Sequence, residues 1–314
     1  SFNRKIKEAF LRFHIDKKIV KISSTTAPVD PHCIIYKCYL NEDKSAHVFP
    51  PADDIMKSDV ILCTPQMSVR LRQMITPDGK PVDKFLSAII VDEVPFTASI
   101  TAMTPIVSQL FQNERNIKVV LLGDNNQLTH TPRSEIGQAR VGPDLLTRLL
   151  NDPHYTEGNG IHIQLTKNYR NPTLTVHIMN RLLYEDSILA CNPNPGVFDA
   201  IHVDSQYKTM IGNSNYSLAE AQSAIKIARD ATGTKKIIVL YKAQECLILR
   251  LLAKHKITDI QVCTAECAQG EEADTIIVSP TIRYAKSPWH DNVKRIVMIL
   301  SRTKSRFVLV GDLT

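Results

Sequence analysis

Two apolar stretches that end in polar residues decide the fold expected of this chain: Ile89–Glu93 (Ile-Ile-Val-Asp-Glu) and Leu121–Leu128 (Leu-Leu-Gly-Asp-Asn-Asn-Gln-Leu). The first places two carboxylates at the tip of a buried β-strand. The second places an amide at the end of another strand. A metal-holding carboxylate, a water-activating carboxylate and a neighbouring amide suit hydrolysis of a nucleoside triphosphate, and the sequence predicts that chemistry.

Other apolar runs of this kind recur along the 314 residues. They are short, continuously apolar and rich in Val and Ile, which is typical of parallel strands covered by helices on both faces. In such α/β sheets ligands bind at the carboxyl ends of the strands. The expected strands are Lys18–Ile22, Val60–Cys63, Ala88–Val91 and Lys118–Leu122 in the first half, and His162–Leu165, Lys236–Tyr241, Thr275–Ser279 and Phe307–Val310 in the second.

The polar stretch Asn151–Gly160 separates two halves that share this rhythm of strands and helices. We therefore expect a first domain over residues 1–157 and a second over residues 158–314. The stretch Gly196–Asn215 shows no clear periodicity, and we expect it to be irregular.

Helical spacing of apolar residues predicts a helix in the opening segment Ser1–Asp16 and another over Ser217–Asp230. In the second helix Ser217 is the expected N-cap, and Glu220 is expected to complete a capping box.

The composition is that of a globular protein, with 43% hydrophobic and 22% charged residues. No apolar run is long enough to span a bilayer, and the charged N-terminal stretch is not a signal peptide. The net charge of +6 permits a polyanionic partner without proving one. The 7 cysteines fit no zinc pattern, and we expect reduced, structural thiols. The odd number of cysteines predicts an intracellular compartment, cytoplasmic or nuclear. We also expect a monomer.

Asp92 and Glu93 are the candidate catalytic carboxylates. Asp92 is expected to hold Mg²⁺, directly or through water, and Glu93 to orient and deprotonate the attacking water. The alternative is a pair of carboxylates that are solvated or cap a helix. The Gly-Asp-x-x-Gln pattern of Gly123–Gln127 on another strand favours the catalytic interpretation.

Gln127 and two arginines are the candidates for phosphate contacts. The Gln127 amide can donate to a phosphate oxygen and accept from a water. Arg170 and Arg302 could clamp a leaving γ-phosphate, since a guanidinium meets phosphate in a planar, bidentate way. The alternatives are a turn glutamine and two ordinary surface arginines, and only the sequence context favours function.

Two further groups of residues are weaker candidates. Gly270 allows a tight turn, and a carboxylate in Gln269–Asp274 can accept hydrogen bonds from a ribose. The hydroxyls of Ser23–Thr26 and Thr64 stand at strand ends, where uncharged donors suit the phosphates of a single strand. Taken singly, helix capping is the better interpretation of these hydroxyls.

The ordered set of motifs resembles superfamily 1 helicases, and within them the branch of the nonsense-mediated-decay RNA helicase and its relatives. The resemblance covers nearly the whole chain, and it depends on the order of motifs that are individually weak. The matching motifs are Ala27–Asp30, Asp59–Thr64, Val91–Glu93, Leu122–Leu128, Asn168–Pro172, Tyr241–Gln244, Gln269–Asp274 and Leu300–Lys304.

The resemblance implies an α/β fold of two RecA-like domains, with ATP and Mg²⁺ between them and single-stranded RNA or DNA across both. The roles it implies are magnesium and water contacts for Asp92 and Glu93, γ-phosphate sensing for Gln127, arginine clamps for Arg170 and Arg302, nucleotide contacts for Gly270 and Glu272, and proximity to the strand for Thr25, Thr26, Thr64 and Gln269.

One departure from this family is large. The sequence contains no Gly-x-x-x-x-Gly-Lys-Ser/Thr loop, whose backbone amides cradle phosphates. The simplest interpretation is a fragment whose loop lies upstream, and this fragment alone is expected to bind ATP poorly. The alternative is a genuine loss of the loop. A smaller departure is Val94-Pro95 after Asp-Glu, where a small or polar pair is usual.

Three functions remain open on the sequence alone. The leading one is an ATP-dependent helicase or translocase core that acts on RNA or DNA. The second is a nucleic-acid-binding clamp that has lost hydrolysis. The third is a kinase or GTPase with the same type of nucleotide-binding fold, against which the second-half arginines and Gln269–Asp274 speak.

Overall fold

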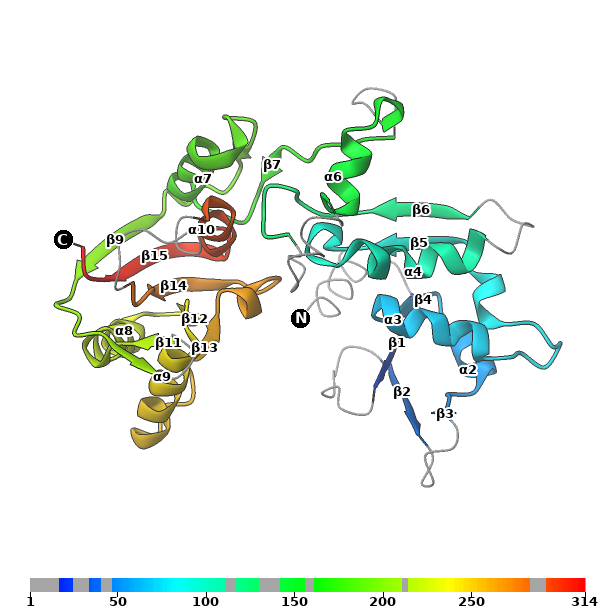
Figure 1. The fold of residues 1–314 in the computed structure, drawn as a ribbon, viewed down its shortest axis with the longest axis horizontal. Helices are drawn as coiled ribbons and strands as arrows, with labels where there is room; N and C mark the ends of the chain where they lie inside the picture. The colour runs from blue at the N-terminus through cyan, green and yellow to red at the C-terminus, as the bar shows by residue number, and fades with distance from the viewer. Residues whose placement is uncertain are drawn as a thin grey trace. The chain divides into compact units, whose positions relative to one another are not determined.

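The structure is a computed structural model of the chain, and it describes residues 17–24, 34–40, 47–110, 117–129, 142–155, 161–210, 214–282 and 292–313. The chain divides into two compact units (Figure 1). The first comprises Ser1–Asn125 and Thr129–His162, and the second comprises Asn126–Leu128 and Ile163–Thr314. The expected domain ranges 1–157 and 158–314 stay a prediction. The expected N-terminal helix, Thr25 and Thr26 lie outside the described residues.

The first unit holds a four-stranded sheet in the order β3-β2-β1-β4 and a separate parallel pair, β5 and β6. In the larger sheet β1 is parallel to both β2 and β4, and β3 is antiparallel to β2. The strands are β1 (Ile19–Ser24), β2 (Ile34–Leu40), β3 (His47–Val48), β4 (Val60–Leu62), β5 (Ala88–Val91) and β6 (Lys118–Leu121).

The helices of the first unit are short apart from α4, and its apolar core forms two clusters. One cluster surrounds Val20 and Ile22 of β1, and the other surrounds Ile89 and Val91 of β5. The helices and 3₁₀ turns are α2 (Ala52–Met56), α3 (Pro65–Ser68), η1 (Val69–Gln73), η2 (Val82–Phe85), η3 (Val94–Phe96), α4 (Ser99–Leu110), α6 (Leu145–Leu150) and η4 (Pro153–Tyr155).

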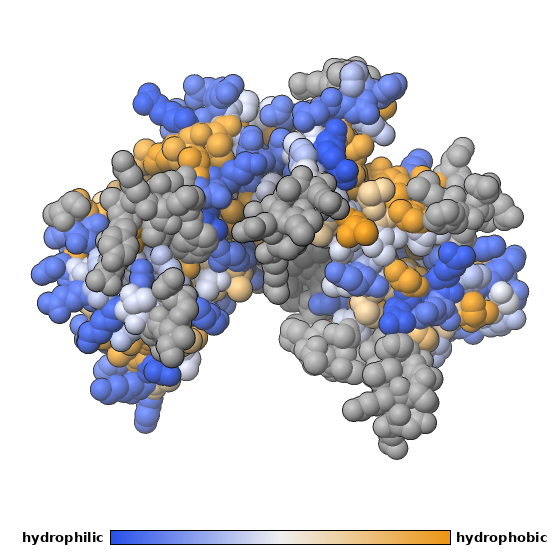
Figure 2. Space-filling view, in the orientation of Figure 1, coloured by the Kyte–Doolittle hydropathy of each residue, from blue (hydrophilic) through white to orange (hydrophobic). Residues whose placement is uncertain are grey.

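The β5–β6 pair is only partly covered. Ile89 and Val91 are buried, whereas Ile90 and Val120 are 66% and 43% exposed. Figure 2 shows apolar side chains at the surface over these strands. The expectation that both faces of this sheet would be covered is therefore wrong for β5 and β6. The pair joins no further strand among the described residues.

The second unit is built on a five-stranded, fully parallel sheet in the order β13-β12-β14-β15-β9. The strands are β9 (Val197–His202), β12 (Lys235–Val239), β13 (Gln261–Thr264), β14 (Ala273–Ser279) and β15 (Thr303–Gly311). Two small pairs accompany this sheet: β7 (Lys167–Asn168) with β8 (Leu189–Ala190), and β10 (Lys208–Met210) with β11 (Ser214–Tyr216).

Helices cover both faces of this sheet (Figure 1). On one face α8 (Leu218–Asp230) and α9 (Lys242–Lys254) pack against Ile237, Ile277 and Val308. On the other, α7 (Thr173–Met179), the π-helical turn η5 (Asn180–Tyr184) and α10 (Val293–Leu300) pack against Ile276 and Phe307. Alternate residues of a strand point to opposite faces, and apolar residues on both sides are the mark of a buried parallel sheet. The predicted α/β fold with parallel sheets of the RecA-like kind is confirmed.

Two sequence predictions in this unit are wrong. His162–Leu165 forms no strand, and Ile163 and Leu165 are 76% and 86% exposed. The stretch Gly196–Asn215 is not irregular, because it supplies the edge strand β9 and the β10–β11 hairpin. The alternation of β9 is weak in sequence, and the pairing with β15 is what makes it a strand.

The predicted capping box at α8 is half right. Ser217 is the N-cap and its hydroxyl accepts from Glu220 N at 3.3 Å. The Glu220 carboxylate does not return to Ser217 N, which donates instead to Gln244 Oε1 at 2.9 Å. Glu220 is fully buried and accepts from Ser205 Oγ at 2.9 Å and Ser279 Oγ at 2.8 Å. Tertiary partners therefore replace the local ones.

Burial raises the pKa of the Glu220 carboxyl above 4.5, although the hydroxyls of Ser279 and Ser205 oppose the shift. The folded protein therefore binds this proton more tightly than the unfolded chain. This group lowers the free energy of unfolding as pH rises above about 4.5. Glu220→Gln, which stays neutral, should become progressively less destabilising relative to wild type as pH rises above about 4.5. Urea denaturation followed by circular dichroism at each pH measures this.

Asp230→Asn, an exposed carboxylate at the end of the same helix, is the matched control and should show no such trend. A difference between wild type and Glu220→Gln that does not vary with pH would show that Glu220 is not titrating in this range.

Gly233 fixes the turn that enters β12. Its φ is +74°, and a Cβ there would meet Asp274 Oδ2 at 2.7 Å. The same oxygen accepts from Thr234 N at 2.8 Å and Thr234 Oγ1 at 2.6 Å. The Thr234 hydroxyl and amide hold the pKa of the Asp274 carboxyl below its ordinary value. The glycine therefore lets the turn close on the carboxylate that begins β14.

Gly233→Ala should lower the free energy of unfolding by about 2–4 kcal/mol, through left-handed strain and displacement of Asp274. Gly270→Ala is the matched control, because Gly270 has φ +75° but nothing within 4 Å of its Cβ position. Its cost should be about 1 kcal/mol. Equal costs in urea denaturation would show that the Asp274 contact adds nothing to the backbone strain.

No described helix has the length and apolar character needed to cross a bilayer. Among the cysteines whose side chains the structure describes, namely Cys63, Cys191, Cys246, Cys263 and Cys267, none forms a disulfide. The expected reduced state of the thiols stays a prediction.

Candidate functional site

Asp92 and Glu93 stand where β5 ends. The parallel register of β5 and β6 pairs Val91 with Leu121, so Asp92 and Gly123-Asp124 lie at the same edge of this sheet. Asp92 is exposed and its Oδ1 accepts from Glu93 N at 2.9 Å. Glu93 has a left-handed backbone with φ 54°. Non-glycine residues in this conformation carry strain that is frequent at functional sites.

The turn after Glu93 is held against β6. Val94 N donates to Leu122 O at 3.0 Å. A Cβ on Gly123 would meet Pro95 Cδ at 2.4 Å, so only glycine fits beside this proline. The unusual Val94-Pro95 pair therefore has a structural account. It packs into the space that Gly123 leaves, and it fixes the direction in which the Asp92–Glu93 turn leaves the strand.

Arg302 is a buried arginine at the amino end of β15, with 3% of its surface exposed. Its Nε donates to Met298 O at 2.9 Å, and its Nη2 donates to Ser301 Oγ at 2.9 Å. The same Nη2 donates to Gln127 Oε1 at 3.0 Å, and Nη1 lies 3.4 Å from Glu271 O. The expected surface alternative for this arginine is therefore wrong. Arg302 is a structural hub as well as a candidate clamp.

The short segment Asn126–Leu128 belongs to the second unit, the same unit as Arg302. Leu128 is 9% exposed and packs in the same core cluster as Met298 and Leu300. The segment is thus anchored by an apolar side chain on one side of Gln127 and by the Asn126–Leu183 contact on the other. Gln127 and Arg302, two of the predicted phosphate-contact residues, lie together.

Arg170 and Glu272 form an ion pair. Arg170 Nε lies 2.8 Å from Glu272 Oε2, and Lys304 Nζ lies 2.9 Å from Glu272 Oε1. The Arg170 side chain is 41% exposed, whereas that of Glu272 is 17% exposed. A predicted phosphate clamp and the predicted ribose acceptor are therefore joined to each other, with Lys304 as a second cation.

Two asparagines for which the sequence predicted no role, Asn168 and Asn171, form hydrogen bonds with the backbone around Arg170 and Arg302. Asn171 is 2% exposed, and its Nδ2 donates to Ser301 O at 3.0 Å and Thr303 O at 2.8 Å, on either side of Arg302. Asn168 Oδ1 accepts from Arg170 N at 3.0 Å. Both lie in the motif Asn168–Pro172 (Asn-Tyr-Arg-Asn-Pro), and this motif is the feature of the sequence that could have pointed to them. They connect the positions of Arg170 and Arg302.

The remaining predicted residues have mixed placements. Gly270 adopts φ +75°, as the predicted tight turn requires, and Gln269 precedes it at the end of η6 (Glu266–Ala268). Thr64 N-caps α3, and its Oγ1 accepts from Met67 N at 3.3 Å. The capping interpretation of Thr64 is therefore confirmed. Its contact with a nucleic acid strand stays a prediction.

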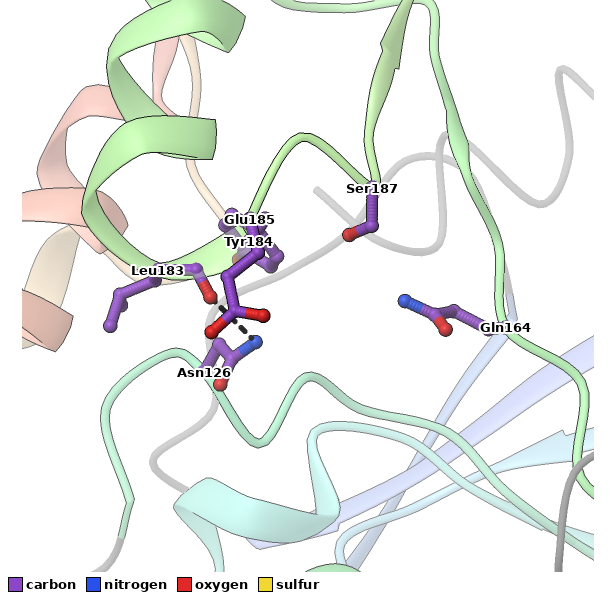
Figure 3. Close-up of a pocket in the computed structure, with 6 residues that line it drawn as sticks. All are labelled: Asn126, Gln164, Leu183, Tyr184, Glu185 and Ser187. Atoms are coloured by element: carbon purple, nitrogen blue, oxygen red, sulfur yellow. Dashed lines mark hydrogen bonds between the residues drawn. The ribbon is translucent and has the colours of Figure 1, made fainter.

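A polar cavity of about 410 Å³ lies next to Asn126 in the second unit. Figure 3 shows Gln164 and Ser187 pointing into it, opposite Asn126 and Glu185. Asn126 Nδ2 lies 3.5 Å from Leu183 O, a weak hydrogen bond. None of the predicted site residues lines this cavity. The link between this cavity and the Gln127–Arg302 contact is that Asn126, which lines the cavity, precedes Gln127 in the sequence.

The second unit therefore presents cations at the amino edge of its sheet. Glu271, Glu272 and Ala273 lead into β14, and Arg302 leads into β15, the strand beside it. One guanidinium and one ammonium, those of Arg170 and Lys304, share the Glu272 carboxylate, and this leaves an excess of positive charge at the pair. Such an edge suits a polyanion, because guanidiniums bind phosphate oxygens with planar, charge-assisted hydrogen bonds.

Comparison with known proteins identifies the class. Residues 145–314 match a family model described as AAA domain. This match covers more than half of the chain, which therefore belongs to that family. The resemblance to superfamily 1 helicases of the nonsense-mediated-decay branch is confirmed by this match and by the curated relatives. The chain is a helicase-type core.

The curated relatives are helicases of distant sequence. The chain is 23% identical to a probable helicase with zinc finger domain of Mus musculus, covering 90% of this chain and 16% of that protein. It is 25% identical to the putative helicase mov-10-B.1 of Danio rerio, covering 84% and 31%. It is 24% identical to an uncharacterized ATP-dependent helicase of Methanocaldococcus jannaschii, covering 71% and 35%. The chain thus spans about a third or less of the length of these relatives.

Among solved structures, the chain is similar to the Arterivirus nonstructural protein 10 helicase. The two are 12% identical with a TM-score of 0.45, over 98% of this chain and 56% of that one.

Arg302→Ala should lower the free energy of unfolding of the second unit by about 2–4 kcal/mol, because buried acceptors at Met298, Ser301 and Gln127 lose their donor. Arg170→Ala should cost less than about 1 kcal/mol, since the Arg170 side chain is 41% exposed and Lys304 still pairs with the Glu272 carboxylate. Urea denaturation of the two variants compares them. Equal costs would show that Arg302 is not the hub described.

Proposed function

We propose that this chain is the motor core of an ATP-dependent helicase or translocase that acts on single-stranded RNA or DNA. The observation that carries the proposal is the Arg302–Gln127 hydrogen bond of 3.0 Å. It joins two residues that the helicase resemblance assigns to the γ-phosphate. The family match and the cationic edge around Glu272 support it.

In the first unit we propose that Asp92 holds Mg²⁺ and that Glu93 orients and deprotonates the attacking water. The residues fit these roles. Asp92 offers an exposed carboxylate oxygen at a strand end, and Mg²⁺ in nucleotide sites is typically held by one or two carboxylates with waters and phosphates. When bound, the ion neutralises charge on the phosphates. Glu93 follows Asp92 directly, in a left-handed backbone conformation.

In the second unit we propose that Arg170 and Arg302 bind the charge of the γ-phosphate and that Gln127 contacts it. Gly270 and Glu272 would contact the nucleotide, with Glu272 accepting from the ribose. Arg302 already donates to Gln127, so both side chains are oriented before a ligand binds. Such preorganisation reduces the cost of arranging them in the transition state.

We propose that the nucleic acid strand passes near Thr64, Gln269, Thr25 and Thr26. Uncharged donors suit a strand held by its phosphates whatever its sequence. One relative of this chain, 24% identical, is named an RNA helicase, Mov10l1 of Mus musculus. We therefore favour RNA over DNA as the strand to test first.

A nucleic-acid-binding clamp without hydrolysis is the second candidate. The cationic edge around Glu272 favours it, because its cations could bind the phosphates of a strand as well as those of a nucleotide. Salt-sensitive strand binding that nucleotide does not alter would support the clamp, because phosphate contacts alone release counterions.

In the full-length protein, ATP hydrolysis should be stimulated by single-stranded RNA. Glu93→Gln should lower kcat by about 100-fold or more, since the general base is lost while the fold and strand binding stay intact. Steady-state hydrolysis and RNA binding by fluorescence anisotropy give the two readings.

Asp53→Asn, an exposed carboxylate of the first unit, is the matched control and should hydrolyse ATP like wild type. Hydrolysis that survives in Glu93→Gln would remove the assignment of the base. Strand binding by a wild-type protein that does not hydrolyse ATP would establish the clamp instead.

A further inference from the structure

Lys304 is a cation beside Glu272 to which the proposed function gives no role. Its Nζ lies 2.9 Å from Glu272 Oε1, and its side chain is 38% exposed. Apart from the hydrogen bonds of Thr234, the positive charge of Lys304 lowers the pKa of the Asp274 carboxyl, and the negative charge of Glu272 raises that pKa. Lys304 lies on β15, and Glu272 and Asp274 lie at the start of the neighbouring strand β14.

The backbone makes the Lys304–Glu272 pair a fixed one. Ala273, next to Glu272, pairs with Thr303, next to Lys304. Ala273 N donates to Arg302 O at 3.1 Å. Both members of the pair therefore extend from directly hydrogen-bonded strand ends, which keeps their backbones close together.

The Arg170–Glu272 pair is of a different kind. Arg170 lies in the exposed turn between β7 and α7, and its side chain is 41% exposed. A guanidinium that turns to bind a phosphate in a bidentate way weakens its contact with the carboxylate, because the phosphate and the carboxylate repel each other at close range. Glu272 is thus a competitor of the phosphate for Arg170.

We propose that Lys304 is a positioning residue for nucleotide binding: it holds the Glu272 carboxylate in place for the ribose, so that Arg170 can exchange Glu272 for a phosphate. A carboxylate can accept about four hydrogen bonds, so it can keep an ammonium and accept a hydroxyl at once.

This inference rests on the proposed function, in particular on the ribose contact of Glu272. It adds a division of labour between two cations. Lys304 stays with the carboxylate in both states, and Arg170 moves between the carboxylate and the nucleotide.

The test uses the full-length protein with Lys304→Met and Lys304→Arg. Lys304→Met should raise KM for ATP by about tenfold, the size expected for one charge-assisted hydrogen bond, and should leave kcat within about twofold. The preference for ATP over 2′-deoxy- and 3′-deoxy-ATP should shrink in this variant, because Glu272 is no longer held for the ribose. Lys304→Arg should restore both properties.

Lys235→Met is the matched control. Lys235 pairs with Asp259 at 2.8 Å in the same unit, and its loss should leave KM and sugar preference unchanged. The effect of Lys304→Met should also vanish in a Glu272→Gln background, since a merely structural role of Lys304 would persist there.

Calorimetric binding of ADP to wild type distinguishes failure of this inference from failure of the proposed function. If wild type binds ADP and Lys304→Met binds it equally well with unchanged sugar preference, the inference about Lys304 is overturned and the proposed function stands. If wild type binds no nucleotide, the proposed function fails and takes the inference with it. A fall in kcat at constant KM would make Lys304 a residue of the chemical step and would also overturn the proposal.

Discussion

The buried guanidinium of Arg302 is the constraint on which the second unit's charged edge depends. A cation that is 3% exposed must have its donors satisfied by protein groups, because an uncompensated buried charge is very costly. Those groups come from the end of α10 and from Gln127. Asn171 then ties the backbone on either side of Arg302 to the Asn-Tyr-Arg-Asn-Pro turn. Positions far apart in the sequence are therefore fixed by one side chain.

At the two edges of the parallel sheet in this unit, a carboxylate is stabilised in different ways. At the carboxyl edge, the buried Glu220 is surrounded by neutral donors from Ser205, Ser279 and the Thr281 amide, and its pKa is raised by burial. At the amino edge, Glu272 is met by full positive charges and is less buried. The first arrangement stabilises a corner of the fold. The second leaves charge in reach of solvent, where an anionic ligand can compete for it.

In the proposed function, this competition would make Arg170 selective among anions. A phosphate-binding arginine that is exposed and unpaired would meet any anion in solution. Held by Glu272, Arg170 is available only to a ligand that offers more than the carboxylate does, such as several phosphate oxygens at once. Arg302 is held more firmly, by neutral acceptors that a phosphate does not repel. In the proposed function the two arginines would serve different parts of phosphate binding, with Arg302 fixed in advance and Arg170 exchanged when the ligand arrives.

The sequence by itself determined the strands at Ala88–Val91 and Lys118–Leu121, the α8 helix with its Ser217 cap, the tight turn at Gly270 and the polar ends at which the candidate residues stand. These follow from local pattern, because apolar runs, caps and turns depend on neighbouring residues. Only the tertiary structure decided that His162–Leu165 forms no strand, that Gly196–Asn215 supplies β9, that Glu220 turns to Ser279 rather than to its own helix, and that Lys304 and Arg170 share Glu272. These depend on partners distant in sequence, and no local periodicity records which strand edge or charge will be nearby.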